Sequence, residues 1–233
     1  MATSEGTVGE FKRYGVYVVP EGALFAAGSA WLGWDSAAGG AVAQPLVADL
    51  PEDAEALTAT PRKYGLHGTI KPPFFLADGT EAAELDAAVR AFCAPRAPVV
   101  IPALQVTPMS GFVALAPSEP SDALAELAGS AVAALDGFRA PPSAAELARR
   151  RKAGLTDVQE ALLQRWGYPY VMQAFRFHMT LTGRTPHVDA VCAALSRHFA
   201  PVLPRPFVID TLALMGEDAG GKFHLVHRYP LSG

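Results

Sequence analysis

The chain has 233 residues, of which 50% are hydrophobic, and a formal net charge of −4 at pH 7. A chain of this length can bury a sizeable core, either as one large domain or as two small lobes that share an interface. The negative balance excludes the broad basic field by which many proteins hold nucleic acid, so any phosphate binding has to be local.

The cysteines and the polar N-terminus predict a cytoplasmic protein. Cys93 and Cys192 lie in separate Ala-rich stretches without the close Cys or His spacing of a zinc site, so we expect reduced thiols and no metal. Residues 1–10 lack the basic-then-apolar order of a signal peptide, and no apolar run is long enough to span a bilayer. We expect a monomer with no membrane partner and no cofactor.

Strand and helix signals alternate along the first part of the chain. β-Branched and aromatic residues favour strands, Gly and Pro end them, and Ala/Leu periodicity favours helices. The predicted elements are a strand at 13–19, a helical or irregular stretch around Trp31 and Trp34, a strand at 64–71 stopped by Pro72-Pro73, a helix over 80–94, and a hairpin of 99–106 with 112–116.

The last part of the chain repeats this order. Its predicted elements are a strand at 175–182, a helix over 186–199, and a hairpin of 207–215 with 222–229. The segment from His67 to the turn glycine Gly111 is nearly as long as the segment from His178 to Gly220. We therefore predict an internal strand–helix–hairpin duplication in which each copy carries one His-x-Thr motif.

A segment without a counterpart, residues 122–170, separates the two copies. Ser143-Ala144-Ala145-Glu146 has the form of a capping box and should open a helix that carries the basic run 149–152. Such a run is more typical of a solvated helix face than of a phosphate site. A further helix should end at Gly167. Because the insertion interrupts the duplication, we expect residues 139–170 to border the cleft between the copies.

The paired His-x-Thr motifs suit acid–base chemistry at phosphorus. Side chains at i and i+2 of a strand project to one face, so His67 lines up with Thr69, and His178 with Thr180. If the copies pack about a pseudo-twofold axis, the imidazoles face each other. One neutral histidine can take a proton from water or a sugar hydroxyl, while the other, protonated, delivers a proton to the departing oxygen. The threonine hydroxyls can bond the phosphate oxygens without a metal.

One His-x-Thr alone is a weak signal, because threonine is common in strands and a strand histidine usually has a structural role. Its repetition at matched positions favours catalysis. Lys71 shares the face of His67 if the strand persists, and Arg184 follows the second motif. We predict phosphate contacts for both, with an ordinary solvated lysine as the alternative for Lys71. The other histidines are assigned surface or capping roles.

Longer strings surround the two motifs. They are Arg13-Tyr14, Tyr64 to Phe74, Arg139-Ala140-Pro141-Pro142, Trp166 to Tyr170, and Phe175 to Gly183. These strings resemble the two-histidine (2H) phosphoesterase superfamily, whose members include RNA ligase-like proteins and cyclic nucleotide phosphodiesterases. Within it, they are most similar to a bacterial branch of uncharacterised proteins encoded in phosphonate-utilisation operons.

The resemblance implies an α+β fold of 2H phosphoesterase type, in which two duplicated strand–helix–hairpin lobes with antiparallel sheets face a central cleft. As one bilobal domain it would cover residues 11–233, with units at about 60–118 and 171–231 and a helical insertion at about 122–170. The catalytic residues implied are His67, Thr69, His178 and Thr180, and the substrate contacts expected beside Lys71 and Arg184 are Arg13, Tyr14 and Tyr170.

The leading hypothesis is a metal-independent phosphoesterase that acts on a small cyclic phosphate or phosphodiester of a sugar or nucleotide, in phosphonate metabolism. The alternatives are an enzyme that processes RNA ends bearing a 2′,3′-cyclic phosphate, and a non-catalytic module that binds a phosphosugar or nucleotide. The net charge, and the lack of aromatic residues interleaved with basic ones, disfavour an extended nucleic acid partner. Hydrolysis and ligation are not separated by the sequence, nor are the acid and the base.

Overall fold

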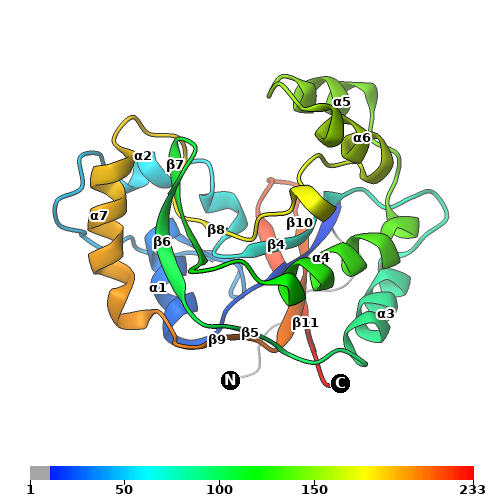
Figure 1. Ribbon diagram of the computed structural model, residues 1–233, viewed down its shortest axis with the longest axis horizontal. Helices are drawn as coiled ribbons and strands as arrows, with labels where there is room; N and C mark the ends of the chain where they lie inside the picture. Colours follow the sequence, from blue (N-terminus) through cyan, green and yellow to red (C-terminus); the bar gives the residue numbers. More distant parts are fainter. Residues whose placement is uncertain (1–10) are drawn as a thin grey trace.

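A seven-stranded antiparallel sheet dominates the computed structural model, which describes residues 11–233 (Figure 1). The prediction for the first ten residues lies outside the described part. Across the sheet the order is β11-β10-β1-β4-β8-β7-β6. Its strands are β1 Arg13–Val18, β4 Gly68–Phe74, β6 Leu104–Met109, β7 Phe112–Pro117, β8 Met179–Thr180, β10 Thr211–Glu217 and β11 Phe223–Pro230. The predicted α+β class with antiparallel pairing is confirmed.

The two halves of this sheet meet at one backbone pair. Gly68 of β4 lies opposite Met179 of β8, whereas the other neighbouring strands pair over several residues or, for β7 with β8, over two. The expected two sheets therefore form one continuous sheet with a narrow joint. The joint is narrow because β8 is only two residues long, shorter than the predicted strand at 175–182.

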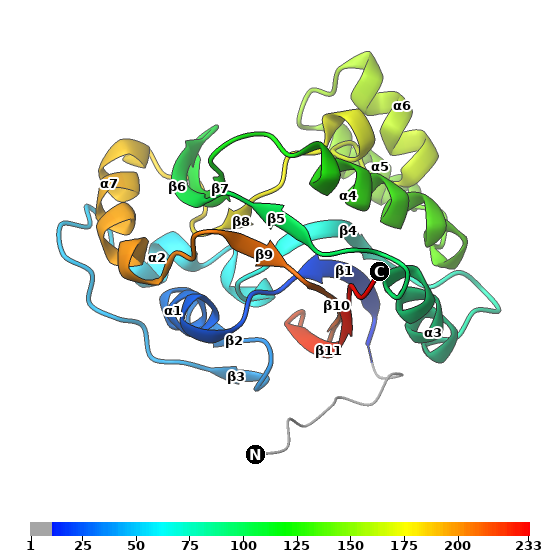
Figure 2. The same ribbon diagram turned by 60° about the horizontal axis from the view of Figure 1, so that its bottom comes forward.

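Helices pack on both ends of the sheet, and the figures agree on their grouping. α1, α2 and α7 lie at one end, and α3, α4, α5 and α6 lie at the other (Figures 1 and 2). No helix within residues 11–233 is long and apolar enough to cross a membrane. The helices are α1 Gly22–Leu32, α2 Ala54–Thr58, α3 Ala82–Cys93, α4 Asp122–Ala134, α5 Ala144–Arg151, α6 Asp157–Trp166 and α7 Val188–Phe199, with short 3₁₀ turns at Arg62–Tyr64, Asp136–Phe138, Met172–Ala174 and Ala200–Val202.

The strand–helix–hairpin order is present twice, and the two copies exchange their hairpins. The β6–β7 hairpin of the first unit lies beside β8 and under α7 of the second, while the β10–β11 hairpin of the second unit contacts α3 of the first. The chain crosses between the halves in two short strands, β5 Val99–Ile101 and β9 Phe207–Ile209. The crossing strands β5 and β9 pair with each other (Figure 2). The two hairpins therefore begin at Leu104 and Thr211, later than the predicted starts at 99 and 207.

The insertion folds as its capping signals predicted. The Ser143 hydroxyl accepts a hydrogen bond from the backbone N–H of Glu146, and the Glu146 carboxylate accepts one from the backbone N–H of Ser143. Thr156 and Gln159 form the same capping box at the start of α6. Gly167 ends α6 with φ 72°, a left-handed conformation that costs glycine little. Backbone hydrogen bonds from Ala77 to Phe138 and from Ala140 to Phe75 tie the middle of the insertion to the residues that follow β4.

The sheet has one large apolar face and one smaller mixed face. A row of opposed residues on the large face, Val18, Gly68, Met179 and Leu115, runs across four strands, and its side chains belong to the main core. The neighbouring row must therefore project to the other face. That second face holds a separate apolar cluster of Tyr17, Val19, Ala213, Met215 and Phe223. A further minor pair, β2 Trp34–Asp35 with β3 Gly40–Ala41, flanks α1.

Candidate active site

The joint of the sheet brings the two His-x-Thr motifs together. Because Gly68 and Met179 are opposed in an antiparallel pair, continuation of that register sets His67 against Thr180 and Thr69 against His178. All four side chains project from the second face of the sheet, opposite the main core, and this face is the site face. The strand partners of the threonines agree, since Thr69 pairs with Tyr17 of the second face and Thr180 pairs with Ala114.

Both imidazoles are held in the same way. Nδ1 of His67 lies 2.9 Å from the carbonyl oxygen of Gly65, and Nδ1 of His178 lies 2.8 Å from that of Arg176. A carbonyl can only accept, so each Nδ1 carries a proton and donates. This fixes the neutral tautomer with the lone pair on Nε2. Each Nε2 is therefore the atom that can accept or deliver a proton.

The two histidines differ in their electrostatic surroundings. Burial lowers the pKa of His67 to about 4, the hydrogen bond to Gly65 opposes this shift, and the charge of His178 lowers the pKa of His67 further. The histidines are thus close enough for one to disfavour the charge of the other. His67 is neutral at pH 7.

Aromatic rings surround His67 more tightly than His178. The ring of Tyr17 meets His67 edge-on at 4.7 Å between centroids, and Tyr64 lies at 5.4 Å. Phe112 at 5.8 Å is the ring beside His178. This packing explains why burial acts on the pKa of His67.

Tyr17 has a hydroxyl group without a hydrogen-bond partner among the described residues, although its side chain is only 1% exposed. Its ring lies over Gly15, where an added Cβ would come within 2.6 Å of the hydroxyl oxygen. A side chain at position 15 would therefore displace the ring that packs against His67. Sequence reasoning missed Tyr17 and Tyr64; the period-two spacing of residues 13, 15 and 17 is the signal that could have found Tyr17.

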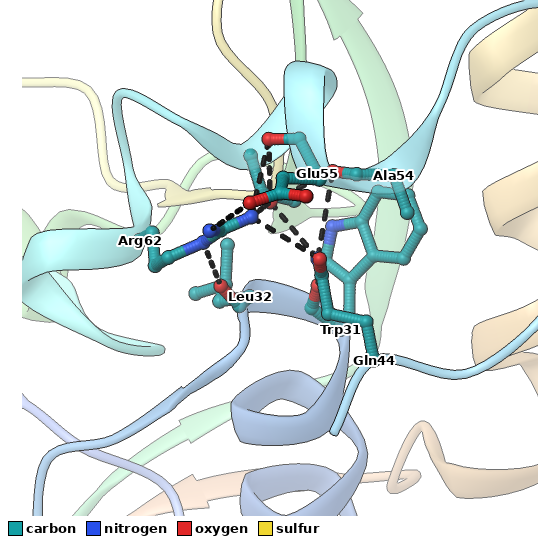
Figure 3. A network of polar contacts seen from close by, with 7 residues as sticks. Trp31, Leu32, Gln44, Ala54, Glu55 and Arg62 are labelled. Carbon is teal, nitrogen blue, oxygen red and sulfur yellow. Dashed lines mark hydrogen bonds and ion pairs between the residues drawn. The ribbon is translucent and has the colours of Figure 1, made fainter. Parts of the chain in front are cut away.

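A polar network around Arg62 holds the segment that leads into the first motif (Figure 3). Arg62, just ahead of His67, donates to the Leu32 carbonyl at 3.0 Å and to the Gln44 side chain at 3.1 Å. Gln44 in turn donates to the carbonyl of Trp31 at 2.6 Å. The indole N–H of Trp31 donates to the carbonyl of Leu181, next to the second motif, at 2.8 Å. One network thus joins α1 to both sides of the site.

Lys71 and Tyr14 do not lie with the histidines. The sequence prediction for Lys71 assumed a regular strand, but β4 is bulged, and its register against β1 shifts between the pairs Tyr17–Thr69 and Val16–Lys71. The bulge turns Lys71 toward α4, where it is 2% exposed and donates to the carbonyl of Val132 at 3.1 Å. The strand also continues through Pro72-Pro73 to Phe74.

Lys71 is part of a buried structural charge cluster. Asp136 lies 3.4 Å from its Nζ and accepts two bonds from Arg139, at 2.8 and 3.0 Å. Burial lowers the pKa of Lys71 to about 8, and Asp136 opposes this shift. Tyr14 is 1% exposed within the main core, on the side of the sheet away from the site face.

The other expected substrate contacts lie on or near the edge of the site face. Arg13 lies on β1, two residues before Gly15. It forms an ion pair with Glu217, which lies opposite it on β10. Arg184 is exposed beside the hairpin turn at Gly111. Tyr170 is 43% exposed and meets Tyr168 edge-on at 5.7 Å.

The insertion reaches the site face through Tyr168 and Arg150. The guanidinium of Arg150 lies 4.3 Å from the ring centre of Tyr168. Burial raises the pKa of Tyr168, and Tyr64 adds to that shift while Arg150 opposes it. Tyr168 is therefore within electrostatic range of the ring that packs against His67. In Figure 1, α5 and α6 stand above the sheet on this side.

An open groove lies between the insertion and the strand ends. It is lined by Arg13, Phe75, Ala140, Pro141, Ser143, Glu146, Arg149 and Glu217. Within residues 11–233 no group of three or more His, Cys, Asp or Glu side chains is arranged to hold a metal ion. The cations that line the groove are Arg13 and Arg149.

Comparison with known proteins gives relatives of greater length. A protein of Janthinobacterium sp. (strain Marseille) named ribose 1,5-bisphosphate phosphokinase PhnN is 40% identical over 231 residues, which are 95% of this chain and 51% of that protein. A protein of the same name from Laribacter hongkongensis (strain HLHK9) is 36% identical over 218 residues, 91% of this chain and 50% of its own length. The chain spans about half the length of these curated relatives.

Solved structures with a similar course of the chain are more distant. A crystal structure described as a phosphoesterase has 14% identity and a TM-score of 0.45, with 95% of this chain and 99% of that chain covered. E. coli LigT complexed with 3′-AMP has 14% identity and a TM-score of 0.44, with 96% and 100% covered. The protein TT0787 of Thermus thermophilus has 16% identity and a TM-score of 0.45, with 95% and 98% covered.

Family membership rests on a model match and not on these distant structures. The family described as "Protein of unknown function (DUF1045)" matches residues 69–224, which include three of the four His-x-Thr positions. An uncharacterised family is what the motif strings indicated. The chain belongs to the DUF1045 family.

Proposed function

We propose that this protein is a phosphoesterase that opens a small cyclic phosphodiester of a phosphosugar, with His67 as general base and His178 as general acid. The observation that carries the proposal is the antiparallel pair of Gly68 with Met179, because it sets two imidazoles and two hydroxyls on one face of the sheet. Each imidazole is held through Nδ1, so both Nε2 atoms are available for proton transfer.

The proposed step balances without a further reactant. The oxygen of a water molecule attacks phosphorus and loses a proton to Nε2 of His67. The bond from phosphorus to one ring oxygen breaks on the opposite side, and that oxygen takes a proton from Nε2 of His178. The hydroxyls of Thr69 and Thr180 donate to the non-bridging oxygens, whose negative charge grows in the transition state.

The roles of the two histidines follow from their surroundings. A general base has to be neutral before the reaction, and burial lowers the pKa of His67 to about 4. His67 therefore meets this requirement at physiological pH. By elimination His178 is the acid, which has to be protonated when substrate binds.

The name of the longer relatives supports a ribose substrate. It refers to ribose 1,5-bisphosphate, and this chain corresponds to about half of each relative. Opening a 1,2-cyclic phosphate of ribose 5-phosphate, with loss of the bond between phosphorus and O2, yields ribose 1,5-bisphosphate. We propose this cyclic phosphate as the substrate, as expected for a role in phosphonate metabolism.

Turnover of defined cyclic phosphates tests the proposal. The purified chain is incubated with the 1,2-cyclic phosphate of ribose 5-phosphate and, at the same ionic strength, with an RNA oligomer that ends in a 2′,3′-cyclic phosphate, since salt changes RNA affinity. Formation of ribose 1,5-bisphosphate with higher catalytic efficiency supports the proposal. Preference for the oligomer with a steep salt dependence assigns RNA end processing, and tight binding without turnover of either compound assigns a non-catalytic module.

A further inference from the structure

We propose that Arg13 and Arg150, with the hydroxyls of Tyr64 and Tyr168, form a subsite for a second phosphate group of the substrate, beside the paired histidines. This inference rests on the proposed function and adds a specificity determinant to it. The subsite would favour a substrate that carries a phosphate monoester in addition to the cyclic diester.

Tyr64 is the point at which the components meet. Its ring packs against His67 at 5.4 Å and stacks on Phe223 at 4.6 Å, so it belongs to the site face. The ion pair with Glu217 is the main cause that raises the pKa of Arg13, and Tyr64 adds to it. Tyr64 also acts on the pKa of Tyr168, whose own ring contacts Arg150. One phenol is thus near the catalytic histidine, β1 and the insertion.

Arg150 differs from its neighbour in the basic run. Arg151 is paired with Glu160 through contacts of 2.6 to 3.1 Å. Arg150 is partly buried against the ring of Tyr168, and within residues 11–233 Glu146 acts on it electrostatically without forming an ion pair at contact distance. Burying a guanidinium without a paired anion costs desolvation free energy, which a bound anion would offset. A phosphate group would supply it, with bidentate geometry.

The charges that line the adjacent groove balance, and Arg150 adds a cation beside it. Arg13 and Arg149 line it together with Glu146 and Glu217, and Arg150 lies next to Arg149 and within electrostatic range of Arg13. With Arg150 included, three arginines and two carboxylates lie in this region. Within residues 11–233 Arg13 bonds Glu217 through Nε, which leaves donors on its terminal nitrogens for an anion.

A buried hydroxyl adds an independent sign of a ligand. Tyr17 is 1% exposed, lies between the His67 ring and the Arg13 end of β1, and has an oxygen without a partner in the described part of the chain. Native proteins rarely leave such a group unpaired. Tyr168 is close enough to influence the pKa of Tyr17, which burial raises well above 10. A phosphate or sugar hydroxyl between them would satisfy this donor.

The test compares two substrates that differ only in the second phosphate. Catalytic efficiency is measured on the 1,2-cyclic phosphate of ribose 5-phosphate and on that of ribose, for the wild type, Arg150→Gln, Arg150→Lys and the matched control Lys152→Gln, which removes an exposed cation after the same helix. We expect Arg150→Gln to reduce the preference for the 5-phosphate compound by roughly 10- to 100-fold, through KM. The efficiency on ribose 1,2-cyclic phosphate should fall much less than that on the 5-phosphate compound, Arg150→Lys should retain part of the preference, and the control should retain all of it.

A binding measurement keeps the subsite separate from the proposed reaction. Calorimetry gives the Kd values of ribose 1,5-bisphosphate and ribose 1-phosphate for the same four proteins. If neither cyclic phosphate is turned over but Arg150→Gln still weakens the bisphosphate alone, the proposed function fails and the subsite stands. If wild type shows no preference for the second phosphate, or Arg150→Gln weakens both compounds equally, the subsite is overturned.

Discussion

Gly68 of β4 and Met179 of β8, the middle residues of the two His-x-Thr motifs, lie directly opposite each other. The pseudo-twofold relation of the two units therefore passes between them. Equivalent crossing strands pair in the same manner, with Val100 opposite Val208. A site built on such an axis holds its two histidines in equivalent backbone settings, and the surrounding side chains make them chemically different.

Gly68→Ala should disturb the site without replacing any of the four side chains proposed to be catalytic. A Cβ at this position would come within 2.3 Å of the Phe177 ring, next to His178. We expect a loss of about 1–3 kcal/mol in the free energy of unfolding and a lower kcat. Adding Phe177→Leu to make room should restore part of both, as measured by denaturant unfolding and turnover. Full activity of Gly68→Ala alone would show that the joint tolerates displacement.

His67→Ala and His178→Ala should each lower kcat/KM by roughly 100- to 10,000-fold, the usual effect of losing a positioned acid or base. The control is His187→Ala, which removes an exposed histidine at the start of α7. The double variant should be little worse than either single variant, because the two groups act in one step. Near wild-type turnover in both single variants would refute histidine catalysis.

The acid limb of the pH profile should lie well below the ordinary histidine pKa of 6.5. Because burial lowers the pKa of His67 to about 4, the base stays neutral down to that pH, and kcat/KM should fall only as pH approaches it. Between pH 6.5 and 4 the unfolded chain binds more protons at His67 than the folded chain. The free energy of unfolding therefore decreases as the pH is lowered through this window. Circular dichroism at each pH separates the two effects. A limb near pH 6.5 would contradict the assignment of His67 as base.

Lys71→Met should change how stability depends on alkaline pH. The pKa of Lys71 is lowered by burial to about 8, so between pH 8 and 10.5 the unfolded chain holds more protons and the wild-type free energy of unfolding gains from rising pH. For one proton this gain is at most about 1.4 kcal/mol per pH unit. Denaturant unfolding from pH 7 to 9.5 should show the gain relative to Lys71→Met. Lys152→Met, which replaces an exposed lysine, should have the same pH dependence of the free energy of unfolding as the wild type.

Turnover should survive prolonged treatment with EDTA, because imidazoles and hydroxyls carry every proton and hydrogen bond of the proposed step. The measurement is the initial rate before and after dialysis against the chelator. A loss of rate that added divalent metal restores would replace this scheme with a metal-assisted one.

The sequence by itself determined the elements and the motifs of this protein. Capping boxes at Ser143 and Thr156, the helix end at Gly167 and the strand–helix–hairpin order are local, because neighbouring residues supply both donor and acceptor or the required backbone conformation. The repeated His-x-Thr was visible for the same reason. Period two along a strand also placed His67 and Thr69 on one face.

The tertiary structure decided which residues share the site. A one-residue slip of β4 against β1 sends Lys71 into the core, and no local pattern announces that bulge. The exchange of hairpins depends on the pairing of β5 with β9, two strands far apart in the chain. Tyr17 and Tyr64 pack against His67, and Tyr168 lies within electrostatic range of both, because β1 and the insertion fold toward the same face. The burial that lowers the pKa of His67 is a property of that assembly.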